Sequence, residues 1–153
     1  THEGFLFLAV VMDLFARNIV GWSMGPRITD DLVLDALTMS YWRRKPRNKV
    51  MLHSDQGSQY TSSRCKRLLK TLNMEASMSR RGNCHDNAVA ESFFANLKKE
   101  KIRRIKYKTR ADARHAMFNY IEMFYNPKRR HTHNDRVPPT VYEQRYLTNL
   151  ESV

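Results

Sequence analysis

Two carboxylates in the sequence stand where they could hold a metal ion. Asp55 follows a β-prone segment, residues 50–54, and precedes a loop that contains a glycine, so it would lie at a strand end. Glu91 lies within a helical pattern, after three small residues, 88–90, that favour close packing against a sheet. Carboxylate oxygens are preferred ligands of Mg²⁺. Other interpretations stay open, because an Asp before Gln-Gly also forms turns and Glu91 can be an exposed helical residue.

Glu91 shares one predicted helical face with two other polar residues. Asn87 is one turn before it, and Lys98 is seven residues after it, so two turns bring Lys98 back to nearly the same face. If this face packed against a sheet, Glu91 would be nearly buried and would need a positive partner such as a metal ion. The stripe is either a polar binding site or a chance arrangement on a solvated helix.

Basic residues are in large excess. The chain of 153 residues has 27 Lys and Arg against 15 Asp and Glu, a net charge of +12. Eight of the thirteen residues in 98–110 are Lys or Arg, and only Glu100 opposes them. A solvated face usually mixes its signs, so this excess favours a polyphosphate partner over a merely solvated surface. Two smaller clusters are Lys128, Arg129, Arg130, His131 and His133, and Arg43, Arg44, Lys45, Arg47 and Lys49.

Several other classes of protein are disfavoured. The longest apolar run, residues 5–12, is too short to span a membrane. Cys65 and Cys84 do not form a metal-spaced pair, which argues against a zinc site and fits reduced cytosolic thiols. His131 and His133 lie two residues apart in a basic loop, which favours phosphate contact or a plain loop role over metal ligation.

Strands come first in the predicted order, alternate with helices, and then give way to helices. The expected strands are residues 5–12, buried and central, 19–24, paired with the first as a hairpin, 50–54 and 74–79. The expected helices are one capped by Thr29 or Asp30, one capped by Thr61 or Ser62, and residues 87–104, 111–125 and 141–147. This order predicts one layered α/β domain, and the hairpin excludes a purely parallel sheet.

Motifs along nearly the whole chain resemble those of one family. They are LAVVMDLFAR at 8–17, IVGW at 19–22, LHSDQGSQYT at 52–61, SMSRRG at 77–82, DNAVAESFF at 86–94, LK at 97–98, YN at 125–126, RH at 130–131 and Pro139. In this order they resemble the catalytic core of the retroviral integrase superfamily and, more closely, the transposases of IS3-group insertion sequences. The thirty-five residues between Asp55 and Glu91 match that family's spacing for its second and third acidic residues.

The resemblance implies a ribonuclease-H-like fold: a mixed sheet of N-terminal antiparallel strands plus a parallel strand, flanked by helices. It also implies that two Asp and one Glu hold two Mg²⁺ ions, for which Mn²⁺ can substitute. Asp55 and Glu91 then become catalytic residues and metal ligands, and Lys98 contacts DNA near the scissile phosphate. The candidate DNA-binding residues are Asn87, Lys98, Lys99, Lys101, Arg103, Arg104, Arg130 and His131.

The implied activity is Mg²⁺-dependent cleavage and strand transfer at insertion-sequence ends. The expected partners are element ends, target DNA and further copies of the chain, which would form a multimer. No membrane partner is expected, and the expected location is the bacterial cytoplasm at the nucleoid. Residues 1–125 are expected to form the integrase core, with residues 126–153 as a basic extension of the same domain. The alternatives are a ribonuclease-H-like nuclease and a non-catalytic DNA-binding remnant.

The sequence departs from the family pattern at its start. In the family the first catalytic Asp lies on a strand just before the position of Thr1, and a helix-turn-helix region lies further upstream. Asp13 would be a substitute, but in the family pattern this position falls at the hairpin and is not a metal ligand. We therefore expect these 153 residues to be a core fragment with little or no transposase activity alone.

Overall fold

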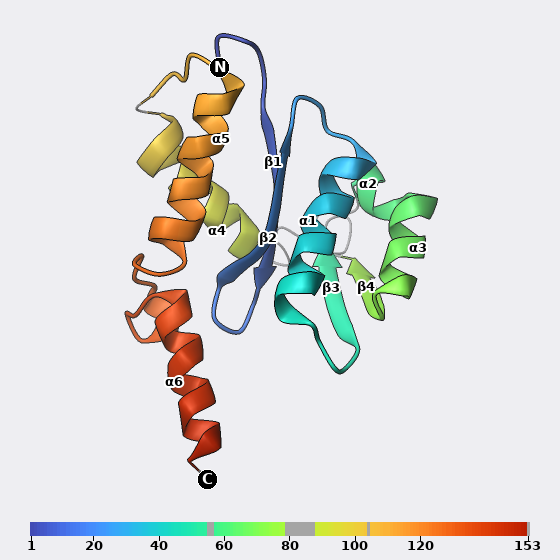
Figure 1. Cartoon of the computed structure of the whole chain (residues 1–153), viewed down its shortest axis with the longest axis vertical. Helices are drawn as coiled ribbons and strands as arrows, with labels where there is room; N and C mark the ends of the chain where they lie inside the picture. Colours follow the sequence, from blue (N-terminus) through green and yellow to red (C-terminus); the bar gives the residue numbers. More distant parts are fainter. Residues whose placement is uncertain (55–56, 79–87, 104, 153) are drawn as a thin grey trace. The chain divides into compact units, whose positions relative to one another are not determined.

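The structure is a computed structural model that describes residues 1–54, 57–78, 88–103 and 105–152. Figure 1 labels most of its elements. In chain order they are β1 (Phe7–Asp13), β2 (Asn18–Gly25), α1 (Asp30–Arg44), β3 (Val50–Ser54), α2 (Ser58–Thr61), α3 (Ser63–Thr71), β4 (Met74–Met78), α4 (Ala88–Leu97), the π-helix η2 (Lys98–Ile102), α5 (Arg110–Phe118), the π-helix η3 (Asn119–Tyr125), the 3₁₀ turn η4 (Thr132–Asn134) and α6 (Pro139–Glu151).

The chain forms two compact units. The central unit consists of Phe5–Val11 and Val20–Ile105, and the C-terminal unit of Thr1–Gly4, Met12–Ile19 and Lys106–Val153. The tip of the β1–β2 hairpin therefore belongs to the C-terminal unit. The expected division at residue 125 stays a prediction.

Both expected kinds of strand pairing are present. β1 and β2 form a two-stranded hairpin, and β3 pairs with β4 in parallel from Val50 opposite Met74 to Ser54 opposite Met78. The expectation that the first strand is central and buried is wrong for the described part of the chain. There β1 pairs with β2 alone, and all seven of its residues are half-buried. A run of apolar residues indicates a strand but does not say how many neighbours it has.

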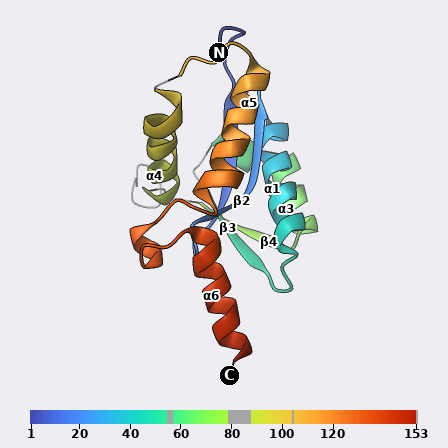
Figure 2. The same ribbon diagram turned by 60° about the vertical axis from the view of Figure 1, so that its left-hand side comes forward.

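The core of the central unit lies between α1, α3 and strands. Val33 and Leu37 of α1 pack with Cys65 and Leu69 of α3, and strand residues, Leu52 among them, pack against this cluster. Figures 1 and 2 both show α1 and α3 side by side. The core holds β3 in place, and therefore positions the strand end that precedes Asp55.

Local sequence signals explain where the two core helices begin. The Thr29 hydroxyl accepts a hydrogen bond from the backbone N of Leu32, and the Ser62 hydroxyl accepts one from Cys65 N at 3.1 Å. Thr29 and Ser62 were among the expected caps, and such caps satisfy amide groups that have no partner within the helix. The short helix α2 was not predicted, because its four residues include none that is buried and so carry no apolar periodicity.

The later helices follow the predicted spacing. α4 continues into η2, and α5 continues into η3. α6 is longer than the expected 141–147, because Pro139 at its start is already set for helical geometry. None of the helices in the described residues is long and apolar enough to cross a membrane.

Candidate active site and basic surfaces

The end of β3 is the first part of the candidate site. Ser54 is buried and is the last residue of the strand, whereas His53 is exposed. His53 Nδ1 lies 3.3 Å from the hydroxyl oxygen of Ser77, directly opposite on β4, so a side-chain hydrogen bond joins the two strands near their carboxyl ends. Asp55, the expected second ligand, comes next in the chain and lies outside the described residues.

Glu91 lies in the first turn of α4, and its side chain is exposed. Phe93 and Leu97 are the buried residues of this helix, at 1% and 2% exposure, so they mark its inner side. Of the two placements that the sequence left open, the structure shows the exposed one. An exposed carboxylate keeps its hydration and needs no positive partner for stability, and it is accessible to a ligand from solvent.

Lys98 is exposed, as Glu91 is. It follows α4 without a break, because the backbone at Leu97 is still helical. The seven-residue spacing therefore brings Lys98 to nearly the face of Glu91, as the sequence predicted. An exposed carboxylate and an exposed ammonium group thus lie two turns apart. Asn87, predicted for the same face, lies outside the described residues.

The basic stretch after α4 begins as a π-helix. Arg103 N donates a hydrogen bond to the carbonyl oxygen of Lys98 at 2.8 Å, five residues back. Lys99 and Arg103 are exposed and Lys101 is half-buried, while Arg104 lies outside the described residues. The accessible cations of this stretch follow directly on the helix that carries Glu91.

The second basic cluster belongs to the C-terminal unit. Arg130 is exposed, whereas His131 is half-buried with its ring edge-on to Tyr125 at 4.8 Å between centroids. The backbone of His131 pairs with that of Val137 in an isolated antiparallel bridge. This packing holds His131 in place within the loop, and Arg130 remains exposed to solvent.

Tyr107 in the basic stretch is half-buried. Burial raises the pKa of its phenol above the ordinary value. The side chain is therefore a neutral hydrogen-bonding group at physiological pH.

Asp13 lies at the hairpin, as expected. It ends β1, and its Oδ1 accepts a hydrogen bond from the backbone N of Phe15 at 2.9 Å. This is the ordinary way in which an Asp side chain supports a turn. Among residues 1–54, 57–78, 88–103 and 105–152, no three His, Cys, Asp or Glu side chains form a group that could hold a metal ion.

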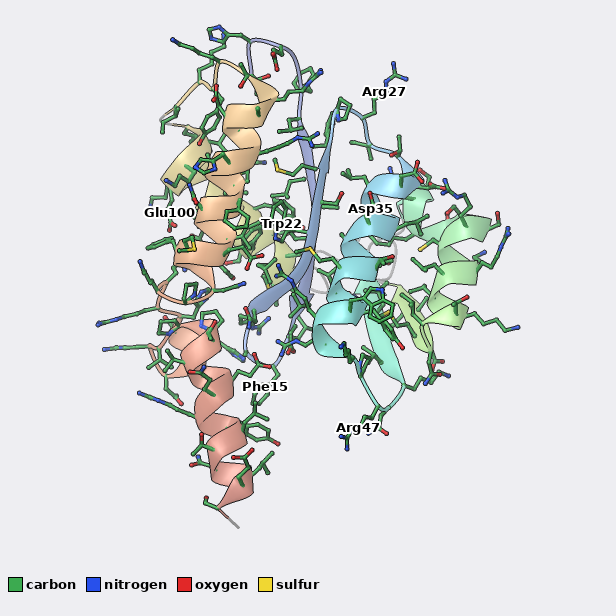
Figure 3. All side chains as sticks on the ribbon, viewed as in Figure 1. Phe15, Trp22, Arg27, Asp35, Arg47 and Glu100 are labelled. Atoms are coloured by element: carbon green, nitrogen blue, oxygen red, sulfur yellow. The ribbon has the colours of Figure 1, made fainter. Side chains whose placement is uncertain are left out.

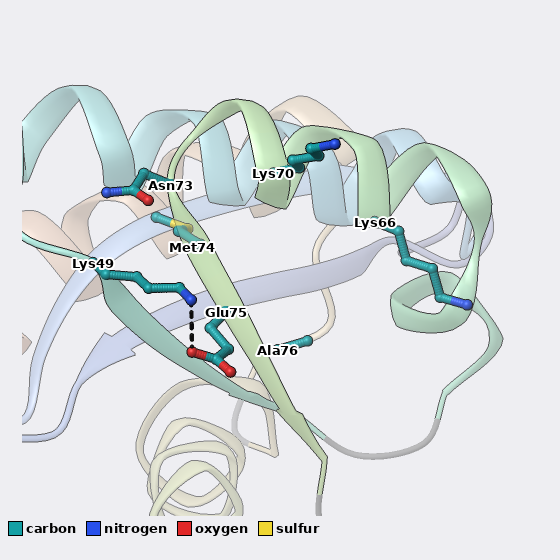
Figure 4. Close-up of a pocket in the computed structure, with 7 residues that line it drawn as sticks. All are labelled: Lys49, Lys66, Lys70, Asn73, Met74, Glu75 and Ala76. Atoms are coloured by element: carbon teal, nitrogen blue, oxygen red, sulfur yellow. Dashed lines mark ion pairs between the residues drawn. The ribbon is translucent and has the colours of Figure 1, made fainter.

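Sequence reasoning missed one basic feature, a hollow of about 400 Å³ in the central unit (Figure 4). We call it the lysine hollow. The signal was present in the sequence, because two of its lysines are four residues apart on a helix whose opposite side is apolar. Its lining includes Lys49, Lys66, Lys70, Asn73, Met74 and Glu75.

Comparison with known proteins identifies the family. The integrase core domain family matches residues 1–84 and again residues 91–147. The chain belongs to the integrase core domain family. The resemblance inferred from its motifs is thereby confirmed.

Its relatives include transposases of insertion sequences. The chain is 46% identical over 144 residues to the transposase for insertion sequence element IS904 of Lactococcus lactis, an alignment that covers 94% of this chain and 57% of the relative. It is also 46% identical over 147 residues to transposase InsF for insertion sequence IS3A of Escherichia coli, covering 96% of this chain and 51% of the relative. The chain thus spans about half the length of these curated relatives.

Solved structures share the fold at low sequence identity. The catalytic core domain of BIV integrase matches with a TM-score of 0.62 and 19% identity, over 98% of this chain and 93% of that one. A simian T-cell lymphotropic virus intasome, in complex with the PP2A regulatory subunit B56 gamma, contains a chain that matches with a TM-score of 0.62 and 14% identity, over 80% of this chain and 44% of that one. The mixed α/β fold is therefore ribonuclease-H-like, as the sequence predicted.

Proposed function

We propose that this chain is the catalytic core of a DNA transposase, which cleaves phosphodiester bonds at insertion-sequence ends and joins them to target DNA. The observation that supports this most is the exposed pair Glu91 and Lys98, two turns apart on one helix face. The pair occurs in a chain that is 46% identical to insertion-sequence transposases over 94% or more of its length.

The proposed chemistry is phosphoryl transfer in two displacements. In cleavage, a water oxygen forms a bond to phosphorus while the bond from phosphorus to a 3′-oxygen breaks, and that oxygen takes a proton. In strand transfer, the freed 3′-hydroxyl oxygen attacks a phosphorus of target DNA, and another 3′-oxygen leaves. One phosphodiester forms for each one broken, so strand transfer needs no external energy source.

Asp55 and Glu91 would hold the metal ions. The integrase core domain family generally uses divalent ions, and Mg²⁺, with Mn²⁺ as its substitute, prefers carboxylate oxygen ligands such as the exposed one of Glu91. When bound, such ions lower the pKa of an attacking water or hydroxyl and neutralise charge on the leaving oxygen. Lys98 would meet the DNA backbone beside the scissile phosphate, with Lys99, Lys101 and Arg103 further along it.

We extend the proposal to further DNA contacts, to a multimer and to the bounds of the core. Asn87, Arg104, Arg130 and His131 would contribute further contacts with element ends or target DNA. To process two DNA ends together, the chain would act as a multimer. It would do so in the bacterial cytoplasm, at the nucleoid. Residues 1–125 would form the catalytic core, with residues 126–153 as its basic extension.

The metal-ligand role of Glu91 can be tested without measuring catalysis. Glu91→Gln keeps the shape of the side chain but removes its charge, so we expect Mn²⁺ affinity to fall at least about tenfold. Removal of a group that only hydrogen-bonds to a metal ligand already costs about 10–100-fold in metal affinity. Asp35→Asn is the matched control, because Asp35 is an exposed carboxylate on α1 (Figure 3). Equal Mn²⁺ binding by wild type and Glu91→Gln would remove Glu91 from the metal site.

The DNA-contact role of Lys98 has its own test. If Lys98 meets a phosphate, Lys98→Ala should lower the slope of log affinity against log salt by about 0.9. Arg27→Ala is the control, since Arg27 is exposed and lies outside the three basic clusters (Figure 3). An unchanged slope for Lys98→Ala places this lysine outside the interface.

Two alternatives are separated by substrate and by metal. A nuclease of this fold would prefer RNA–DNA hybrid or branched DNA over a duplex element end and would not join strands. A non-catalytic binder would keep full DNA affinity in Glu91→Gln, or gain some, and would show no metal-dependent turnover even within a full-length transposase. The motif that contains Glu91, with Lys98 beyond it, favours the transposase.

A further inference from the structure

The lysine hollow lies in the central unit, where two parallel strands begin. In the register of β3 and β4, Val50 lies opposite Met74. Lys49 and Asn73, the residues before them, therefore stand at the same end of the strand pair, and Val50 N donates a hydrogen bond to the carbonyl oxygen of Asn73. The strand pairing thus brings Lys49 to the start of β4, twenty-four residues away in the sequence.

Two further lysines come from the helix before β4. Lys66 and Lys70 are four residues apart on α3, so they share one face, and both are exposed. Cys65 and Leu69, the residues just before each of them, are buried in the core. Packing of these two residues fixes the rotation of α3 and turns its lysines outward, so the fold itself places their charges.

The charge balance of the hollow is positive. Three lysines line it together with one acid, Glu75, whose carboxylate lies 3.0 Å from the amino group of Lys49 (Figure 4). Lys66 and Lys70 form no ion pair within the described residues. By contrast, Arg64 of the same helix is paired with Asp31 at 2.7 Å.

The basic surface continues beyond the hollow. Arg67 is exposed on α3, and Lys45 is exposed at the end of α1. Arg47 is exposed in the loop that leads from there to Lys49 (Figure 3). This loop belongs to the cluster at 43–49, to which the candidate active site gives no role. Two basic segments, far apart in the sequence, therefore border one hollow.

We propose that the lysine hollow is a second contact for the DNA backbone, separate from the basic stretch at Lys98–Arg103. This inference rests on the proposed function for the choice of DNA as partner. Lys66 and Lys70 meet phosphates along one strand, and Lys49, held by Glu75, marks the edge of the contact. Because these are phosphate contacts, they position DNA without reading its sequence.

DNA fits this surface better than a free phosphate or nucleotide does. The hollow is bordered by flexible, exposed lysines that act as point charges. The described residues that line it include no arginine and form no cluster of backbone amides of the kind that encloses a single phosphate group. Its positive surroundings extend over α3 and the 45–49 loop, which suits a polymer with a regular row of phosphates.

The experiment measures DNA affinity of the full chain against salt by fluorescence anisotropy, with a short labelled duplex of arbitrary sequence. Lys66→Ala combined with Lys70→Ala should lower the slope of log affinity against log salt by about two units, close to 0.9 for each lost phosphate contact. Glu75→Gln should raise affinity, because it removes the acid of the hollow. Arg27→Ala serves as the control, and circular dichroism checks that each variant is folded.

An unchanged slope in the double lysine variant overturns the proposal. If that variant, with its DNA slope unchanged, also loses binding to poly-glutamate, the hollow is a site for an acidic polypeptide instead. Lys98→Ala, measured in parallel, separates the two claims. If its slope falls and that of the double lysine variant does not, the hollow fails as a DNA contact and the proposed function stands.

Discussion

Asn126 offers a quantitative test of how the hairpin is held within the C-terminal unit. Its Oδ1 accepts a hydrogen bond from the backbone N of Ile19 at 2.9 Å, and its Nδ2 donates one to the carbonyl oxygen of Ile19 at 3.0 Å. Asn126 is 7% exposed and Ile19 is 1% exposed. The side-chain amide thus pairs with both backbone groups of Ile19, as a neighbouring strand would, across 107 residues of sequence.

The expected cost of Asn126→Ala follows from these two bonds. The substitution leaves a buried N–H and a buried C=O of Ile19 without their partners, and each such group costs about 1–3 kcal/mol. The free energy of unfolding should therefore fall by about 2–6 kcal/mol, a large share of the stability of a small protein.

Urea denaturation followed by circular dichroism measures this change. Asn149→Ala is the matched control, because Asn149 is exposed on α6; its effect should stay within about 0.5 kcal/mol. If Asn126→Ala costs no more than Asn149→Ala, Asn126 does not hold the hairpin and the reasoning is refuted.

Three further predictions concern packing and titration. Gly21→Ala should destabilise the central unit by about 1–3 kcal/mol in the same urea assay, because the new methyl group would collide with the carbonyl oxygen of Ala36; an unchanged midpoint would contradict this close approach. The Thr109 hydroxyl, through its hydrogen bond, is the main cause that lowers the pKa of Asp112. The stability from this carboxylate is therefore present above its unfolded pKa and lost as pH falls through the folded one, and Thr109→Ala should raise that pKa in a carbon-detected NMR titration. Burial is the main cause that raises the pKa of the Cys65 thiol. The stability that the neutral thiol contributes is therefore present below its unfolded pKa and lost as pH rises through the folded one. Cys65→Ala should flatten the alkaline limb of a stability–pH profile.

Local signals in the sequence predicted most of the central unit. Ser62 was an expected cap, and the spacing of Cys65 and Leu69 predicted the helix behind it, because caps and apolar periodicity act within a few residues. The segment 50–54 was identified as a strand by its β-forming residues. These local signals did not predict the burial of β1, because its burial depends on strands elsewhere in the chain.

The candidate site was predictable to a different extent at each residue. The shared face of Glu91 and Lys98 follows from helical geometry, so spacing alone was sufficient. The exposure of Glu91 was left open, because it depends on what packs against α4. The lysine hollow was predictable only in part. The four-residue spacing of Lys66 and Lys70 is visible in the sequence, but Lys49 lines the same hollow only because β3 pairs with β4.

The Asn126 bonds illustrate the same limit. The motif at 125–126 was recognised from its resemblance to the family, and the structure gives a physical reason for its Asn. No local pattern connects Asn126 with Ile19, because the contact depends on the fold of the C-terminal unit.

We infer that Glu91 serves DNA transposition. The most direct test of this role is the transposition frequency of a marked insertion sequence in cells, driven by a full-length transposase gene that contains these 153 residues, with Glu91→Gln compared against wild type and Asp35→Asn. We expect Glu91→Gln to abolish transposition at unchanged protein level and DNA affinity, while Asp35→Asn transposes as wild type does. Transposition by Glu91→Gln at the wild-type frequency would contradict it.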